Sequence, residues 1–114
     1  MTTSSEVLDK GVDLSSLRPG SLIDVETRSR HYRIECLGGD AIRISGHPEY
    51  CPNPVPAHLQ GAIDKEGELE FGFIEPGMRM RFFLNNRPVI TSKVLHVHVD
   101  QPEPAQPSSS QRIN

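Results

Sequence analysis

The sequence predicts an all-β fold, a small single-domain β-barrel or half-open barrel of about six or seven short antiparallel strands. Three observations predict it. Apolar and polar residues alternate over most of the segment between Leu14 and Val99, which is the period of a strand with one buried face. Glycine, proline, asparagine and aspartate interrupt this alternation at short intervals, as expected at turns. No segment has the period of an amphipathic helix longer than one turn.

The sequence of the first half of the domain predicts a three-stranded meander. Alternation places Ile23 and Val25 on the inward face of its first strand. The expected strands are residues 22–28, 31–37 and 41–45, with tight turns at 29–30 and 38–40. Residues 14–17 are expected to form one 3₁₀ turn at an end of the fold. The run from Leu17 to Thr27, followed by two short strands, is similar in strand spacing to SH3-like and Sm-like small barrels, and no motif diagnostic of a family accompanies it.

Strands resume after a proline-rich loop. The expected strands are residues 58–63, 68–74, 78–84 and 89–99, separated by polar turns at 64–67, 75–77 and 85–87. The residues expected on their inward faces are Leu69, Phe71, Phe73, Met78, Met80, Phe82, Leu84, Leu95, Val97 and Val99. His96 and His98 are expected to point outward from the last strand.

The domain is predicted to span residues 13–100, between disordered tails at 1–12 and 101–114. Both tails contain few large apolar residues, so they bury too little surface to offset the entropy lost on ordering. The N-terminus lacks the basic and apolar regions of a secretory signal, and no apolar run approaches the roughly 20 residues that span a bilayer. Two cysteines cannot build a disulfide framework. We therefore expect a cytoplasmic protein with reduced thiols and no membrane contact.

The proline-rich loop, residues 46–57, is the segment best suited to binding. Between Gly46 and Pro56 it holds four prolines in eleven residues, which excludes a helix or a central strand. Long loops without secondary structure are often functional. Within the loop, Tyr50 and Val55 are the expected apolar anchors for a partner.

The charge of the chain argues against a general nucleic-acid binder. The formal charge is −3, and the segment from Arg18 to Val99 carries ten acidic and ten basic residues. A neutral domain lacks the positive field with which proteins hold phosphates. The alternative function is RNA binding by a local basic face, which requires that the strands carrying it are neighbours. Its residues would be the outward Arg28, Arg30, Arg33, Arg43, Arg79, Arg81 and Lys93. Arg79 and Arg81 are its candidate RNA contacts, whereas acidic residues of the same strands favour ordinary cross-strand pairing.

A zinc site is the second alternative. His96 and His98 lie on one side of the last strand, about 6.5–7 Å apart, a spacing that can chelate a metal ion. His47 and Cys51 would complete the ligand set if the proline-rich loop folds over that strand. No paired-cysteine motif is present, so the competing interpretation is that the histidines face solvent and Cys51 packs as a small hydrophobe. No cofactor is predicted.

No catalytic motif is recognisable. Cys36 and Cys51 are the candidate nucleophiles, and no phosphate-binding loop, carboxylate pair or family signature surrounds them. The sequence therefore predicts a non-enzymatic binding or assembly module. Its proline-rich loop and an adjacent strand edge are expected to contact a protein partner or a second copy of the chain, with Cys51 and His47 in the binding loop.

Overall fold

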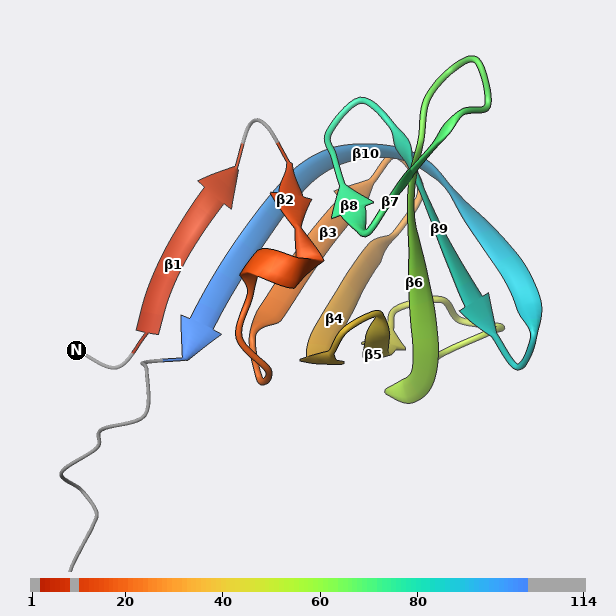
Figure 1. Ribbon diagram of the computed structural model, residues 1–114. Coiled ribbons are helices and arrows are strands. Elements are labelled where there is room, and N and C mark those ends of the chain that lie inside the picture. Colours follow the sequence, from red (N-terminus) through yellow and green to blue (C-terminus); the bar gives the residue numbers. More distant parts are fainter. Residues whose placement is uncertain (1–2, 9–10, 103–114) are drawn as a thin grey trace, which may run out of the picture.

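The computed structural model describes residues 3–8, by their backbone, and residues 11–102 (Figure 1). The all-β class is confirmed, because these residues form strands, turns and one single-turn 3₁₀ helix, η1 (Leu14–Ser16). The strands are β1 (Thr3–Leu8), β2 (Val12–Asp13), β3 (Leu22–Thr27), β4 (His31–Gly38), β5 (Ala41–Ser45), β6 (Val55–Ile63), β7 (Leu69–Phe71), β8 (Phe73–Ile74), β9 (Arg79–Leu84) and β10 (Arg87–Pro102). No helix in this part of the chain is long and apolar enough to cross a membrane.

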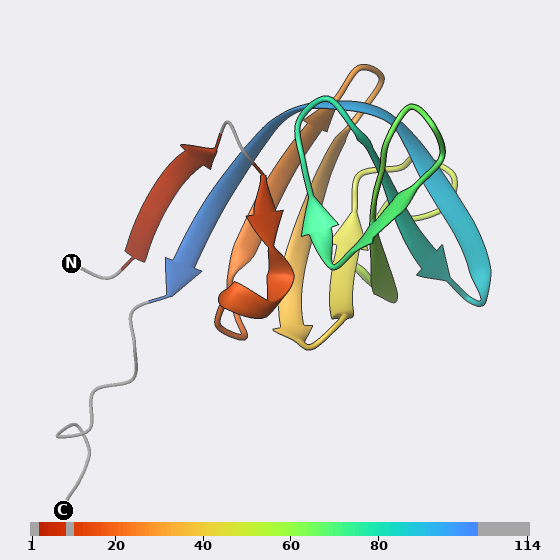
Figure 2. The ribbon, with the colours of Figure 1, turned by 45° about the horizontal axis from the view of Figure 1, so that its top comes forward.

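Six strands form a closed ring of hydrogen-bonded antiparallel neighbours, in the order β10-β3-β4-β5-β6-β9. β10 closes the ring because residues 87–93 pair with β9 and residues 94–100 pair with β3. The register shifts between Ile90 and Lys93 and again between Val94 and His96. Figure 2 shows β10 arching over the other strands. Outside the ring, β1 pairs with β10 and β7 pairs with β6.

Aliphatic side chains fill the interior of the ring. One buried layer crosses four strands through residues that stand directly opposite one another, namely Val99, Ile23, Ile34 and Ile44. Tyr32 packs edge-on against Phe82, with ring centroids 6.0 Å apart. The predicted meander between residues 22 and 45, with its inward and outward faces, is therefore confirmed.

The inward position predicted for Leu95 is wrong. Val94 and Val97 are buried, whereas Leu95 is 40% exposed. The register shift between Val94 and His96 inserts an extra residue into β10, so the alternation of faces changes at this point. Val97 and Val99 then follow the predicted alternation, with His96 and His98 on the outer face.

The predicted strand at 68–74 is interrupted, and Phe71 does not face inward. Gly72 has a φ of +74° and separates β7 from β8. β7 pairs with β6, and β8 pairs with β2 in a second, two-stranded sheet. As a result Ile74 is buried, while Phe71 is 73% exposed. Positive φ interrupts the strand alternation, and glycine tolerates it without strain.

Within the segment 1–12, which the sequence predicts to be a disordered tail, residues 3–8 form β1 and residue 12 belongs to β2. β1 pairs with β10 from Thr3–Pro102 to Leu8–Val97. The backbone of β10 provides hydrogen-bond partners that do not depend on apolar side chains, so a polar sequence can extend the sheet there. Residues 101 and 102 belong to β10, and the rest of the predicted C-terminal tail, 103–114, lies outside the described residues.

Candidate functional site

The proline-rich loop is shorter than predicted and is built around a tight turn. Residues 55–57 extend β6, because β5 provides them with backbone partners despite the proline at 56. The loop proper, 46–54, contains an isolated bridge between His47 and Cys51. The N–H of Gly46 donates to the carbonyl of Cys51 at 2.8 Å, and the N–H of Cys51 donates to the carbonyl of His47 at 2.9 Å.

The His47 ring holds the turn in place and orients Tyr50. Its Nδ1 accepts hydrogen bonds from the N–H groups of Glu49 and Tyr50, at 3.1 and 3.2 Å. The imidazole stacks on the Tyr50 ring, with centroids 4.3 Å apart and planes 24° apart. Burial, and secondly the positive charge of Arg30, lower the pKa of His47 below its ordinary value. Both effects favour the neutral imidazole, which is the form whose Nδ1 can accept these bonds.

Neither cysteine is placed for chemistry at neutral pH. Cys51 is completely buried, so its side chain anchors the loop in the core instead of facing a partner. Burial raises its pKa, against a smaller opposing effect of its backbone hydrogen bond at His47. Burial, with the nearby charge of Glu35, raises the pKa of Cys36 to about 11. Both thiols are therefore protonated at neutral pH, and both are free.

Tyr50 is the centre of a surface formed by Arg30, Tyr50 and Ile90, which are exposed, and by His47 and Val89, which are half-buried; it is referred to below as the Tyr50 surface. The side chains of Tyr50 and Ile90 are each 50% exposed. Tyr50 lines two hollows, one of about 160 Å³ toward the β3–β4 turn and one of about 230 Å³ toward the β9–β10 hairpin. Val55, the second predicted anchor, is half-buried and packs against the core.

Along residues 87–91 of β10, the edge beside Tyr50 pairs with no strand in the described part of the chain. β9 occupies the opposite edge, and β3 begins to pair with β10 only at Val94. Where this open edge ends, the N–H of Ser29 donates to Ser92 Oγ at 3.1 Å. The Tyr50 surface thus combines an aromatic ring on a structured loop with an open strand edge.

A larger groove, of about 560 Å³, lies over the middle of β6, between the start of β5 and the end of β7. Phe71 lines it, and His58 contributes a ring whose Nδ1 is 3.4 Å from Asp40 Oδ1. Gln60 Oε1 is buried there and has no hydrogen-bond partner within the described ranges. This groove was not predicted from the sequence. The signal that could have indicated it is Gly72, which can interrupt the strand and leave Phe71 exposed.

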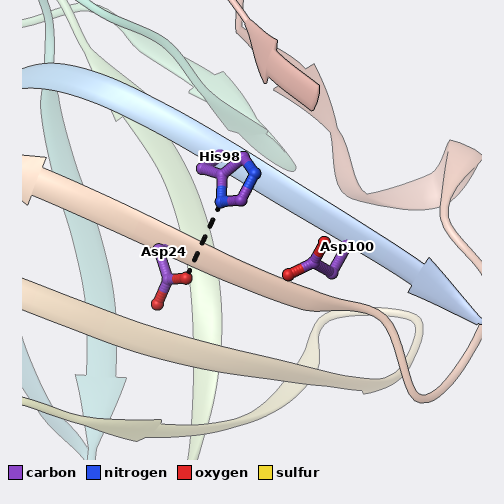
Figure 3. Close-up of side chains that lie close together, drawn as sticks. All are labelled: Asp24, His98 and Asp100. Carbon is purple, nitrogen blue, oxygen red and sulfur yellow. Dashed lines mark ion pairs between the residues drawn. The ribbon is translucent and has the colours of Figure 1, made fainter. Parts of the chain in front are cut away.

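A polar cluster lies on the outer face of β3 and β10 (Figure 3). His98 stands opposite Asp24, and Asp100 follows two residues later on the same face. A ring nitrogen of His98 and one oxygen each of Asp24 and Asp100 lie within 4.8 Å of one another. His98 Nδ1 is 4.0 Å from Asp24 Oδ2. The other oxygen, Asp24 Oδ1, is 3.7 Å from Arg33 Nη1 and 3.8 Å from His31 Nε2.

The structure does not bring the predicted zinc ligands together. His47 and Cys51 lie in the loop beside the β9–β10 hairpin, whereas His96 and His98 lie in the half of β10 that pairs with β3. His96 is exposed and stands opposite Glu26. Over residues 11–102, one set of at least three metal-ligating side chains has donor atoms within 4.8 Å of one another, and it is Asp24, His98 and Asp100. Of the four predicted ligands, this set contains only His98.

The predicted basic face is divided between two sides of the ring. Arg33 and Arg43 project from β4 and β5, and each faces a carboxylate of the preceding strand, at 3.7 and 2.9 Å respectively. Arg79 and Arg81 lie on β9, on the opposite side of the ring from β4. Two strands lie between β9 and β4 in either direction, β10 and β3 one way and β6 and β5 the other. The Arg81 guanidinium lies 5.5 Å from the centroid of the Phe83 ring. Three of the six guanidinium groups of this face, those of Arg33, Arg43 and Arg81, therefore have a partner inside the protein.

No protein-family description, curated protein or solved structure matches this chain. The function is therefore inferred from the geometry of the candidate sites alone.

Proposed function

We propose that this protein is a non-enzymatic binding module that captures an extended polypeptide segment of a protein partner at the Tyr50 surface. The observation that carries the proposal is the fixed but half-exposed ring of Tyr50. It is held by stacking on His47, whose Nδ1 is in turn held by two backbone N–H groups. A large apolar side chain held rigidly at the surface is a characteristic of interface anchors.

Preorganisation supports this assignment on energetic grounds. Binding at a flexible loop loses conformational entropy, about 0.5–1.5 kcal/mol for each rotamer-rich side chain that becomes fixed. In this loop the Tyr50 ring is already fixed, Cys51 is anchored in the core, and prolines at 48, 52 and 54 restrict the backbone. Tyrosine and arginine are also the residues enriched in binding hot spots, and Arg30 lies next to His47 and Tyr50.

The open edge of β10 supports an extended conformation for the bound segment. In a two-residue hairpin the closing pair, here Leu84 and Arg87, exchanges hydrogen bonds across the hairpin. The alternation of antiparallel pairing then directs the backbone groups of Pro88 and Ile90 toward the open edge. An added strand would bond to Ile90 and place a side chain in the hollow beside Tyr50. Because Pro88 offers no N–H, the edge is protected from indiscriminate pairing.

The proposal also covers the fold, a small β-barrel, and the location of the protein, the cytoplasm. The closed ring supports a small β-barrel similar in strand spacing to SH3-like and Sm-like barrels, a scaffold that supports many binding functions through its loops and edges. The two free, buried thiols are consistent with a reducing compartment, which supports a cytoplasmic location.

The test is selection of peptides from a displayed random library on the full chain, followed by affinity measurement by fluorescence polarisation. We expect the Tyr50→Ala variant to fold normally and to lose at least about tenfold in affinity, the scale of a 1.4 kcal/mol anchor. Phe71→Ala is the matched control, because it removes an aromatic ring that is even more exposed, 73% against 50% for Tyr50, from the other groove. Its affinity should equal that of the wild type.

Two results would overturn the proposal. One is that no selected peptide binds, or that binding is unaffected by Tyr50→Ala. The other is that the wild-type chain sediments as a dimer that Tyr50→Ala dissociates, which would make a second copy of the chain the occupant of this surface. If Tyr50→Ala unfolds, Ile90→Lys at the open edge, with Tyr50 left in place, tests the same surface from β10.

A further inference from the structure

We propose that Asp24, His98 and Asp100 form a binding site for one first-row divalent transition metal ion, of which Zn²⁺ is the probe of choice. The site lies on the outer face where β3 pairs with β10 and is independent of the Tyr50 surface. Figure 3 shows the three side chains gathered on the same side of the two strands.

The geometry requires small side-chain adjustments and no movement of the backbone. Metal–ligand bonds of about 2.0–2.2 Å place tetrahedral ligand atoms about 3.4 Å apart. The donor atoms here lie within 4.8 Å of one another, and His98 Nδ1 and Asp24 Oδ2 are 4.0 Å apart. Rotation of the side chains closes this gap, because Asp24 and His98 stand on directly paired residues of two ring strands.

The carboxylate of Asp24 is already oriented for this role. Arg33 and His31, both from β4, approach its Oδ1 at 3.7 and 3.8 Å. Oδ2 is the oxygen that faces His98. A charged partner that holds one oxygen and leaves the other toward the metal is the usual outer-shell arrangement around ligating carboxylates.

The ligand chemistry selects the class of ion. Two carboxylates supply two negative charges, which match a divalent cation. One imidazole nitrogen favours Zn²⁺ and its neighbours over Mg²⁺ and Ca²⁺, which prefer all-oxygen sites. Three protein ligands leave at least one coordination position to water or to a group from another molecule. Arg33 lies on the far oxygen of Asp24 and offsets part of the negative charge, so we expect moderate affinity.

A metal ion at this point would link β3 to the half of β10 that closes the ring. The same stretch of β10 also carries β1 on its other edge. Binding to the folded state alone stabilises that state by mass action. We therefore expect zinc to raise the melting temperature, by several degrees when its free concentration is about a hundred times the dissociation constant.

The experiment uses the full chain, with any affinity tag removed and metal stripped with a chelator, then dialysed free of chelator. Zinc is titrated by calorimetry, and the d–d absorption of bound Co²⁺ reports the coordination geometry of the site. The expected result is one metal ion per chain. Loss of an outer-shell partner typically weakens metal binding by about 10–100-fold, and loss of a ligand should have a larger effect. Asp24→Asn and His98→Gln should therefore each weaken binding by at least about 100-fold. His96→Gln is the control, because His96 lies on the same face of β10 outside the cluster.

Each outcome decides the proposal. Stoichiometric binding that is lost in Asp24→Asn and His98→Gln and retained in His96→Gln supports it. Absence of binding to the wild-type chain, or equal binding by all four proteins, overturns it. If either ligand variant is unfolded without metal, Asp100→Asn replaces it as an isosteric change at the third ligand. Circular dichroism of each stripped protein checks the fold before titration.

Discussion

Replacement of Gly46 by alanine should destabilise this protein far more than the same change at Gly39, although both glycines flank β5. Gly46 has a φ of +124°, and a Cβ there would overlap the carbonyl oxygen of His31 and lie 3.0 Å from the Cα of Tyr32. Gly39 has a φ of +59°, and a Cβ there would meet nothing within 4 Å. The two positions therefore separate backbone strain from steric overlap.

The magnitudes follow from these contacts. At Gly39, alanine carries only the left-handed penalty of about 1–2 kcal/mol. At Gly46, alanine carries a penalty of about 1–3 kcal/mol for a sparsely populated backbone conformation. It also forces apart Gly46 and β4, at a cost of about 1–3 kcal/mol typical of overpacking. The expected loss is thus about 2–6 kcal/mol, a large share of the roughly 5–15 kcal/mol that stabilises a domain.

Urea denaturation followed by circular dichroism measures both variants, and thermal melts should show a shift of about 4–8 °C per kcal/mol. Gly46 also bonds to Cys51 at the base of the turn that presents Tyr50, so Gly46→Ala should weaken partner binding as well. Equal losses of stability at Gly46 and Gly39 would refute the close packing of this loop on β4.

Two further predictions concern β10 and His47. Val97→Ser should cost about 2–4 kcal/mol, because it buries a hydroxyl in the apolar core, whereas Leu95→Ser should change the stability by no more than about 0.5 kcal/mol; a larger loss at Leu95 in urea denaturation would contradict the shift of register. The lowered pKa of His47 means that the unfolded chain binds this proton more readily than the folded protein. Its contribution to stability is therefore complete above the ordinary histidine pKa of 6.5 and is lost as the pH falls below that value. Stability measured between neutral pH and pH 5 should fall less steeply in His47→Gln than in the wild type, and parallel curves would show that His47 is not the titrating group.

Local signals in the sequence were sufficient for most of the ring. Asn85 and Asn86 both adopt positive φ, 52° and 64°, in the two-residue turn that joins β9 to β10. Asparagine tolerates this conformation and is common in such hairpins, which is why the turn could be located from residue type alone. Strict alternation likewise identified the buried faces of β3, β4, β5 and β9, because each has one face in the core.

Local signals failed where the backbone leaves regular pairing. Leu95 and Phe71 were both assigned to the core by counting alternate residues. An inserted residue in β10 and a left-handed glycine after Phe71 change the face, and neither alters the hydrophobicity of the sequence. β1 was missed for a different reason. Its pairing depends on an available edge of β10, which is a property of the folded sheet and not of its own residues.

The metal cluster depends on information that alternation cannot supply. The outward direction of His98 was predicted, but its partners were sought in the proline-rich loop. The pairing of β3 with β10 joins strands far apart in the sequence, and only the register of that pair sets Asp24 opposite His98. A shift of one residue would set a neighbour of Asp24 opposite His98 and would turn Asp24 to the other face of the sheet.

β10 is the element on which both proposals depend, and its construction also keeps them separate. Its first half pairs with β9 and leaves an edge open beside Tyr50, whereas its second half pairs with β3 and carries His98 and Asp100. The two register shifts lie between these halves, where the strand changes partners. β9 pairs with one edge of the first half and β3 with the opposite edge of the second half, so the ring closes with the edge opposite β9 still open, whereas β1 covers the edge opposite β3. The same closure brings a histidine of the last strand against an aspartate of β3, which means that a metal ion there would stabilise the scaffold that presents Tyr50 without contacting the partner.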